Sequence, residues 1–241
     1  MDGHDVGRVS VGGSWAGRMA LATLICGLAA GPAAAAAIKG TVRFAGGPVE
    51  AKKLAVTVDQ FVCGKEKDAD SLLVSARGGI RNAVVWLDAP PQPVPSANMP
   101  MVVQLDQKEC VFIPRVIMVP VGGTVEFLNS DRLLHNIHTI SRDNLTYNRT
   151  QPKGRTIPLT FARPEIIRIT CDLHSWMRAS VVVMAHPYYA VTNADGAFTL
   201  GSVARGTYRL HVWQETLGVV SREVQVGGED VTGVTVEMRV Q

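Results

Sequence analysis

The stretch "EIIRITCDLHSWMRASVVV", Glu165 to Val183, contains two short runs rich in Ile and Val on either side of a tight, polar connection. Short runs of β-branched residues bounded by polar residues predict β-strands. The connection places a thiol, an imidazole and a thioether at intervals of three residues, at Cys171, His174 and Met177. We therefore predict two neighbouring strands joined by a turn that carries metal-ligating residue types.

The rest of the chain follows the same β pattern. Segments such as "NAVVWLD", "MVVQLD" and "TVEFLN" are short, rich in Val, Ile and Thr, and separated by Gly-Gly, Pro-Pro and Asn-Ser. Such spacing predicts an all-β fold, a Greek-key sandwich or barrel, with almost no helix. A second block of strands begins after "HPYYAV". We place a domain boundary near Met184, with a first sandwich over 38–184 and a small second sandwich over 185–241.

Residues 1–37 have the composition of a secretory signal peptide. Arg8 and Arg18 precede an apolar run from Met19 to Gly31, and a small-residue tract with several A-x-A cleavage sites follows. The apolar run is shorter than the roughly 20 residues that a spanning helix needs. We expect cleavage after Ala37, a periplasmic or secreted protein and no stable membrane insertion; initiation at Met19 is an alternative.

A second cluster, "NSDRLLHNIH", brings His135 and His138 to the end of a predicted strand. Thirty-five residues lie between His135 and Cys171, enough for a loop and a strand that return the chain to the same end of the sandwich. Two imidazoles, a thiolate and a weak thioether form the ligand set of a blue copper site. Zinc would gain little from Met177. Taken singly, each residue is more often a packing or loop residue, but the combination favours a metal.

Residues 121–183 resemble the C-terminal half of a cupredoxin, of the plastocyanin and amicyanin type, over about a third of the chain. The matching features are the His-Asn pair after a strand, at His135 and Asn136, and the later Cys-x-x-His with a nearby Met. The resemblance implies copper held by His135 and His174 as imidazole ligands, Cys171 as the thiolate and Met177 as the axial ligand. The tail resembles the carboxypeptidase regulatory-like, or transthyretin-like, sandwich. The combination is similar to exported proteins labelled methylamine utilisation proteins.

The other two cysteines of the exported chain, Cys63 and Cys110, are predicted to form a disulfide. An oxidising compartment pairs accessible thiols, and the metal occupies Cys171. Cleavage of the signal segment would remove Cys26, so the mature chain would have an odd number of cysteines. The formal net charge of +3 gives no reason to expect a nucleic-acid partner.

Polar residues near the ligands have two interpretations each. His138, three positions after His135 on an extended chain, points to the opposite side and is interpreted as a supporting or packing residue, or as a replacement for Met177. Asn129 and Asn136 either hydrogen-bond to the thiolate and fix the loop or are ordinary turn residues.

The ligand set predicts a one-electron carrier that works with a redox protein partner, and not an enzyme, because no coordination position is left for a substrate. Leu133, Leu134 and Trp176 are expected to frame an apolar patch through which electrons leave at the edge of His174, although Trp176 also suits the core. The alternatives are a copper chaperone or sensor, and a sandwich that binds a partner without redox turnover. A chain ending near Met184 is expected to keep its copper spectrum.

Overall fold

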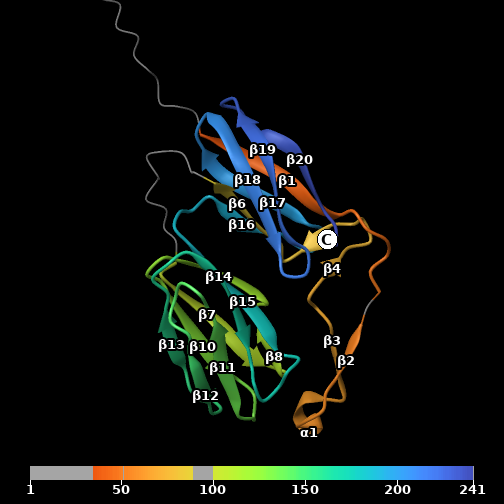
Figure 1. Cartoon of the computed structure of the whole chain (residues 1–241), viewed down its shortest axis with the longest axis vertical. Coiled ribbons are helices and arrows are strands. Elements are labelled where there is room, and N and C mark those ends of the chain that lie inside the picture. Colours follow the sequence, from red (N-terminus) through yellow and green to blue (C-terminus); the bar gives the residue numbers. More distant parts are fainter. Residues whose placement is uncertain (1–34, 51, 89–99, 241) are drawn as a thin grey trace, which may run out of the picture. The chain divides into compact units, whose positions relative to one another are not determined.

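The computed structural model describes residues 35–50, 52–88 and 100–240, so residues 1–34 of the expected signal peptide lie outside the described part. Within the described ranges there are twenty strands and a single four-residue helix (Figure 1). The predicted all-β fold is confirmed. The strands form two sandwiches, each with its own apolar core.

The first sandwich has a four-stranded sheet in the order β13-β10-β7-β8 and a five-stranded sheet in the order β12-β11-β14-β15-β9. Its strands are β7 (Val102–Lys108), β8 (Val111–Ile113), β9 (Val116–Pro120), β10 (Thr124–Asn129), β11 (His135–Ile140), β12 (Asn148–Gln151), β13 (Ile157–Thr160), β14 (Glu165–Thr170) and β15 (Arg178–Met184). In β10 every second residue is buried: Val125 and Phe127 lie in the apolar core, Asn129 is buried at the end of the strand, and the residues between them are partly exposed.

The second sandwich has a three-stranded sheet in the order β17-β1-β20 and a four-stranded sheet in the order β16-β6-β18-β19. Its strands are β1 (Ala36–Phe44), β6 (Val84–Asp88), β16 (Tyr189–Val191), β17 (Ala197–Val203), β18 (Gly206–Gln214), β19 (Gly218–Val226) and β20 (Val231–Met238). His211 of β18 stacks on Trp86 with ring centroids 5.2 Å apart, as expected of a residue on the face of a sheet.

The strand pairing differs from the expected division at Met184. Strand β1 pairs with β17 on one side and with β20 on the other, and β6 pairs with β16 and β18. The leading segment was expected to extend the first domain, but it supplies two strands to the second sandwich. The physical reason is burial: Ile38 and Val42 of β1 are fully buried in a core that β6 and the C-terminal strands share.

Between β1 and β6 the chain forms an arm with three small elements and a further strand pair. They are β2 (Lys53–Ala55), α1 (Gln60–Cys63) and β3 (Glu66–Asp68), followed by β4 (Leu73–Val74) and β5 (Ile80–Arg81). Strands β2 and β3 pair with each other, and α1 occupies the tip between them. The predicted disulfide between Cys63 and Cys110 is present, with the two Cα atoms 5.4 Å apart. It fastens the tip of the arm to the turn between β7 and β8.

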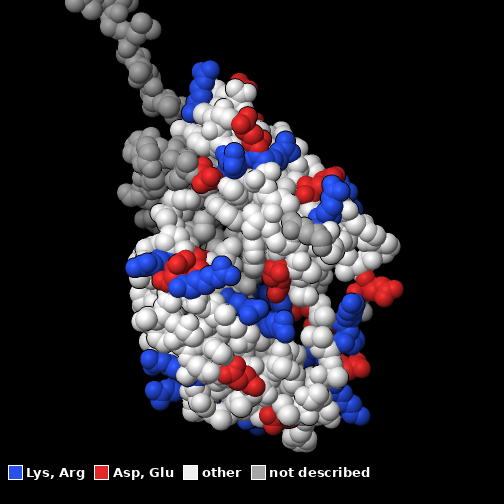
Figure 2. All heavy atoms as spheres, in the orientation of Figure 1, with Lys and Arg blue, Asp and Glu red and all other residues white. Residues whose placement is uncertain are grey.

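Acidic and basic side chains are interspersed over the face drawn in Figure 2. This mixture agrees with the small formal net charge of +3. No helix among the described residues is long and apolar enough to cross a membrane.

Candidate metal centre

Three predicted ligands meet at one end of the five-stranded sheet. His135 is the first residue of β11, and Cys171 follows the last residue of β14. These two strands are antiparallel neighbours, with His138 opposite Thr170, so the start of one lies beside the end of the other. His174 lies in the turn that leads into β15. The sheet register therefore unites residues from two separate sequence clusters.

The donor atoms of these three residues converge. The Nδ1 atoms of His135 and His174 are 2.9 Å apart, and the Sγ of Cys171 lies 3.9 Å from the first and 3.6 Å from the second. All three side chains are buried. His135, Cys171 and His174 thus form one group of potential metal ligands.

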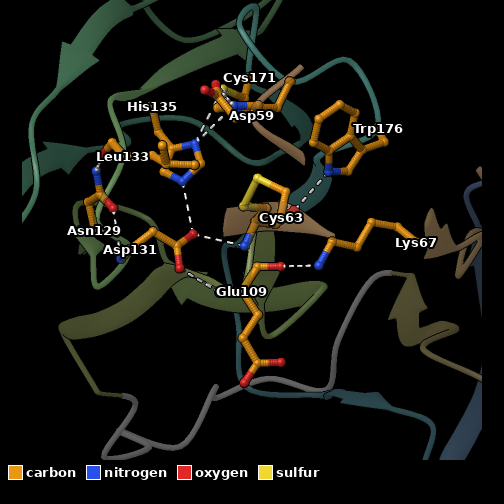
Figure 3. Close-up of a disulfide and its surroundings, with 12 residues drawn as sticks. Asp59, Cys63, Lys67, Glu109, Asn129, Asp131, Leu133, His135, Cys171 and Trp176 are labelled. Carbon is orange, nitrogen blue, oxygen red and sulfur yellow. Dashed lines mark hydrogen bonds and ion pairs between the residues drawn. A yellow bond between two sulfur atoms is a disulfide. The ribbon is translucent and has the colours of Figure 1, made fainter. Parts of the chain in front are cut away.

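The opposite nitrogen of each imidazole faces a carboxylate. His135 Nε2 is 2.9 Å from Asp131 Oδ2 (Figure 3). His174 Nε2 is 3.0 Å from Asp59 Oδ2. An ionised carboxylate only accepts hydrogen bonds, so each Nε2 carries a proton and donates it. In the neutral ring the Nδ1 then holds a lone pair. Two lone pairs facing each other at 2.9 Å beside a thiol have no mutual hydrogen bond, and a cation that accepts them fits this arrangement.

The electrostatics at the site favour neutral groups when no cation is present. Burial lowers the pKa of His135, and the neighbouring His174 lowers it further, against the opposing influence of Asp131. Burial also raises the pKa of the Cys171 thiol, although backbone N–H groups, that of Asn136 first, act in the other direction. A metal that binds here therefore has to displace the thiol proton.

Met177 is almost completely buried, at 1% exposure, and lies in the same apolar cluster as Cys171. Its backbone N–H donates a 2.9 Å hydrogen bond to the carbonyl of His174, which closes the turn. The spacing of Cys171, His174 and Met177 is thus part of one compact turn before β15. Cys110, Asp131 and His135 also lie close together, but the sulfur of Cys110 belongs to the disulfide.

The two asparagines fix loops through their side chains. Asn136 donates its backbone N–H to Cys171 Sγ at 3.5 Å, while its side-chain oxygen accepts the backbone N–H of Asp172 at 2.6 Å. Asn129 donates to the carbonyl of Leu133 and accepts the N–H of Asp131, both within the loop that precedes His135. The contact with the thiol is therefore made by the backbone, not by an asparagine side chain.

His138 stands outside the group of three donors. Its Nδ1 is 2.8 Å from Asp172 Oδ1, and its side chain is 30% exposed. As predicted for an extended strand, it points away from His135. Its partner Asp172 adjoins Cys171, so this pair supports the ligand turn from its outer side.

The expected apolar patch around an exposed His174 edge is not what the structure shows. His174 is fully buried, and the carboxylate of Asp59 accepts a hydrogen bond from its outer nitrogen. Trp176 is also buried, with Nε1 donating to the carbonyl of Cys110 at 2.9 Å, which settles this residue as part of the core. Leu134 is exposed and Leu133 packs partly against the core. The prediction of an open imidazole edge was therefore wrong, because the arm covers it.

Sequence reasoning did not identify the two carboxylates. Asp131 lies four residues before His135, a spacing that could have drawn attention to it. Asp59 lies 115 residues before His174 and carries no local signal.

Comparisons with known proteins match only parts of the chain. A family model described as polysaccharide lyase family 4, domain II, matches residues 160–234. No curated protein matches. Among solved structures, the copper-containing nitrite reductase NirK from Thermus scotoductus SA-01 aligns at 26% identity over 40% of this chain and 25% of its own, with a TM-score of 0.33. The chain thus matches about a quarter of the length of that reductase.

Two smaller proteins align in a similar way. A purple cupredoxin from Nitrosopumilus maritimus shares 22% identity over 34% of this chain and 99% of its own, with a TM-score of 0.31. A reduced amicyanin mutant shares 24% identity over 34% of this chain and 82% of its own, with a TM-score of 0.32. Each of these two alignments leaves most of the present chain unmatched.

Proposed function

We propose that this protein is an exported type 1 copper protein that carries one electron at a time between redox partners. The observation that supports the proposal is the convergence of two imidazole Nδ1 atoms and one thiol, all buried, with both outer imidazole nitrogens bound to carboxylates. Bound copper would supply the exchange of one electron between its two oxidation states. His135, Cys171 and His174 would hold it, and the thioether of Met177 would be a weaker fourth ligand.

The surroundings of the donors suit a carrier better than an enzyme. Hydrogen bonds from Asp131 and Asp59 orient the two rings, and the Asn136 N–H lies against the thiol sulfur. Side chains held in this way need little movement when the charge at the centre changes. With Met177 as the fourth ligand, no position remains for a substrate, so we assign the chain no catalytic role.

The disulfide between Cys63 and Cys110 supports the proposed export, because such bonds persist in oxidising compartments and are rare in the cytosol. The partner is proposed to be another redox protein. We propose a periplasmic or secreted location.

The test is to add copper(II) to the purified chain from Ala36 to Gln241 and to record its visible and electron-spin-resonance spectra. We expect one copper per chain, an intense visible band and a reversible midpoint potential. Cys171→Ser should remove the band, because the colour depends on sulfur donation to copper(II). His211→Gln, in the second sandwich and remote from the donor group in the sequence, is the matched control and should keep it.

Other results would favour the other candidates. Tight binding of copper(I) without a visible band after oxidation would indicate a chaperone or sensor. Preferential retention of zinc in competition with copper would indicate a structural metal site.

A further inference from the structure

The tip of the arm between β1 and β6 forms a cap over His174. The cap consists of residues 56–65, and it is anchored by Val56 and Cys63, both buried in the core of the first sandwich. Between these anchors the chain turns outward, and Phe61 at its tip is fully exposed. Asp59 immediately precedes α1, and its backbone carbonyl accepts the N–H groups of Val62 and Cys63. The start of the helix therefore fixes where Asp59 lies.

The outer nitrogen of His174 is hydrogen-bonded to the side chain of Asp59, and the ring of Trp176 packs on the imidazole with centroids 5.2 Å apart. The imidazole is 0% exposed, whereas the Asp59 side chain is 48% exposed on its outer side. The carboxylate is thus a thin cover between the imidazole and the solvent, at a hydrogen-bond distance of 3.0 Å. No other hydrogen bond to that nitrogen is present among the described residues.

Cys110 connects this cover to the other half of the site. Its sulfur is bonded to Cys63 of the cap, and its backbone N–H donates to Asp131 Oδ2 at 2.8 Å. Asp131 in turn accepts the Nε2–H of His135 (Figure 3). Both imidazoles are therefore oriented by carboxylates that lie beside one disulfide: Asp59 is part of the cap that Cys63 anchors, and Asp131 accepts the backbone N–H of Cys110.

We propose that Asp59 is a positioning residue for His174, that the cap closes the edge of this imidazole, and that the disulfide holds the cap in place. The effect on the midpoint potential rests on the proposed copper function. The positions of Asp59, the cap and the disulfide do not depend on it. A carboxylate that accepts the Nε2–H raises the basicity of the ring as a ligand. A more basic ligand stabilises the higher oxidation state, so Asp59 lowers the midpoint potential. The closed edge also requires electrons to cross the cap or to leave elsewhere.

Two substitutions separate the charge of Asp59 from its hydrogen bond. Asp59 has a φ of 53°, in the left-handed region that Asn and Gly adopt more readily than other residues, so Asp59→Asn and Asp59→Gly avoid a backbone penalty. The Asn variant keeps an accepting oxygen without the charge, and the Gly variant removes both. Glu66→Gln, on the same arm, is the control, because its carboxylate makes no side-chain hydrogen bond or ion pair within the described part of the chain.

The first measurement uses the metal-free full chain and does not depend on copper. Nitrogen-15 NMR of the imidazoles should show a His174 Nε2–H that exchanges slowly with solvent. The slow signal should persist in Asp59→Asn and Glu66→Gln and be lost in Asp59→Gly. A fast-exchanging Nε2–H in the unmodified protein, or an unchanged slow signal in Asp59→Gly, would contradict the proposal that Asp59 and the cap close the edge of His174.

The second measurement uses the copper-loaded chain. Asp59→Asn should raise the midpoint potential while the visible band is kept, and Asp59→Gly should in addition weaken copper binding by about 10- to 100-fold. The double variant Cys63→Ser, Cys110→Ser should reproduce the exchange behaviour of Asp59→Gly if it folds. Unchanged potentials in both Asp59 variants would overturn the positioning role. A protein with a protected Nε2–H but no copper band would instead contradict the proposed function and leave the cap intact.

Discussion

At the scale of single residues, the site is defined by which nitrogen of each imidazole is free. Asp131 and Asp59 each accept a hydrogen bond from an Nε2–H, which leaves both Nδ1 atoms directed at the same point beside Cys171. The tautomers follow from the chemistry of the acceptors, because a carboxylate offers no hydrogen to donate. The residues that select the ligand atoms are thus different from the ligands themselves.

Met177 is expected to tune the site without being essential to it. Met177→Leu should keep a coloured copper site with a shifted midpoint potential, because the axial bond is weak. The substitution changes the volume little and should lower the free energy of unfolding by less than about 1.5 kcal/mol. Spectroscopy with voltammetry measures the first effect and denaturant unfolding the second. Loss of all copper from both Met177→Leu and His138→Gln would show that the coordination is different.

Copper uptake is expected to release one proton from Cys171. Burial raises the pKa of this thiol above its ordinary value of 9.0, so the metal-free protein holds the proton at pH 7. Burial lowers the pKa of His135, which is then neutral at this pH and releases none. Copper affinity should therefore fall about tenfold for each pH unit below neutrality, as one exchanged proton requires.

Calorimetry in two buffers of different ionisation enthalpy measures this proton directly. The result near pH 7 should be close to one proton per copper, and a value near zero would mean that the metal-free protein already holds a thiolate.

At the scale of elements, the loop after β11 is tied to the first residue of β14. The carboxylate of Glu165 accepts hydrogen bonds from the Ser141 hydroxyl, the backbone N–H groups of Arg142 and Asp143, and both the backbone and the side chain of Asn144. Burial opposes ionisation, but these donors outweigh it and lower the pKa of Glu165 to about 2. The strand that leads to Cys171 is thereby anchored at its beginning.

This anchor predicts a pH-dependent contribution to stability. The pKa of Glu165 is lowered on folding from its ordinary value of 4.5, so the stabilisation is complete above pH 4.5 and is lost as the pH falls toward about 2. Glu165→Gln should lower the free energy of unfolding by about 1–3 kcal/mol at pH 7. Urea unfolding at pH 7 and pH 3 tests both statements, and the variant should be less sensitive to this change of pH than the unmodified protein.

The first strand predicts where a signal peptidase would cut. Ala36 is buried and pairs with Val203, and the N–H of Ala37 donates to Asp230 at 2.8 Å. The expected cleavage after Ala37 would remove both residues from β1. Cleavage after Ala35, at another A-x-A site, keeps the strand whole. Mass spectrometry of the exported protein should therefore find Ala36 at its N-terminus, and a chain that begins at Ile38 would contradict this.

At the scale of the whole molecule, strands from early and late in the chain form one sandwich, namely β1 and β6 with β16 to β20. Ile38 in β1 and Leu87 in β6 are fully buried among residues from the C-terminal strands. Arg115 of the first sandwich also forms ion pairs with Asp70 of the arm and Glu215 after β18. Contacts made by the tail thus extend to residues far earlier in the chain.

A chain truncated after Met184 is therefore expected to behave differently from the sequence-based prediction. It would lose both neighbours of β1 and both neighbours of β6, which leaves their backbone groups and apolar side chains exposed. We expect low solubility and loss of cooperative unfolding, measured by size-exclusion chromatography and circular dichroism against the chain that ends at Gln241. A monomeric truncated protein with an unchanged copper spectrum would instead show that the first sandwich tolerates unpaired β1 and β6.

The amino-acid sequence alone was enough to predict the all-β class, the pairing of Cys63 with Cys110, and the local groups of donor residues around His135 and Cys171. These features depend on short-range patterns: alternating burial, turn residues, cysteine number and the spacing of residues on one turn. The pairing of β1 with β17 and β20, and the contact between Asp59 and His174, became known from the folded chain. These strand pairs and this hydrogen bond join residues more than 100 positions apart. They form because the fold buries matching apolar faces together and because the buried polar groups then need hydrogen-bond partners. A local sequence pattern contains no information about either condition.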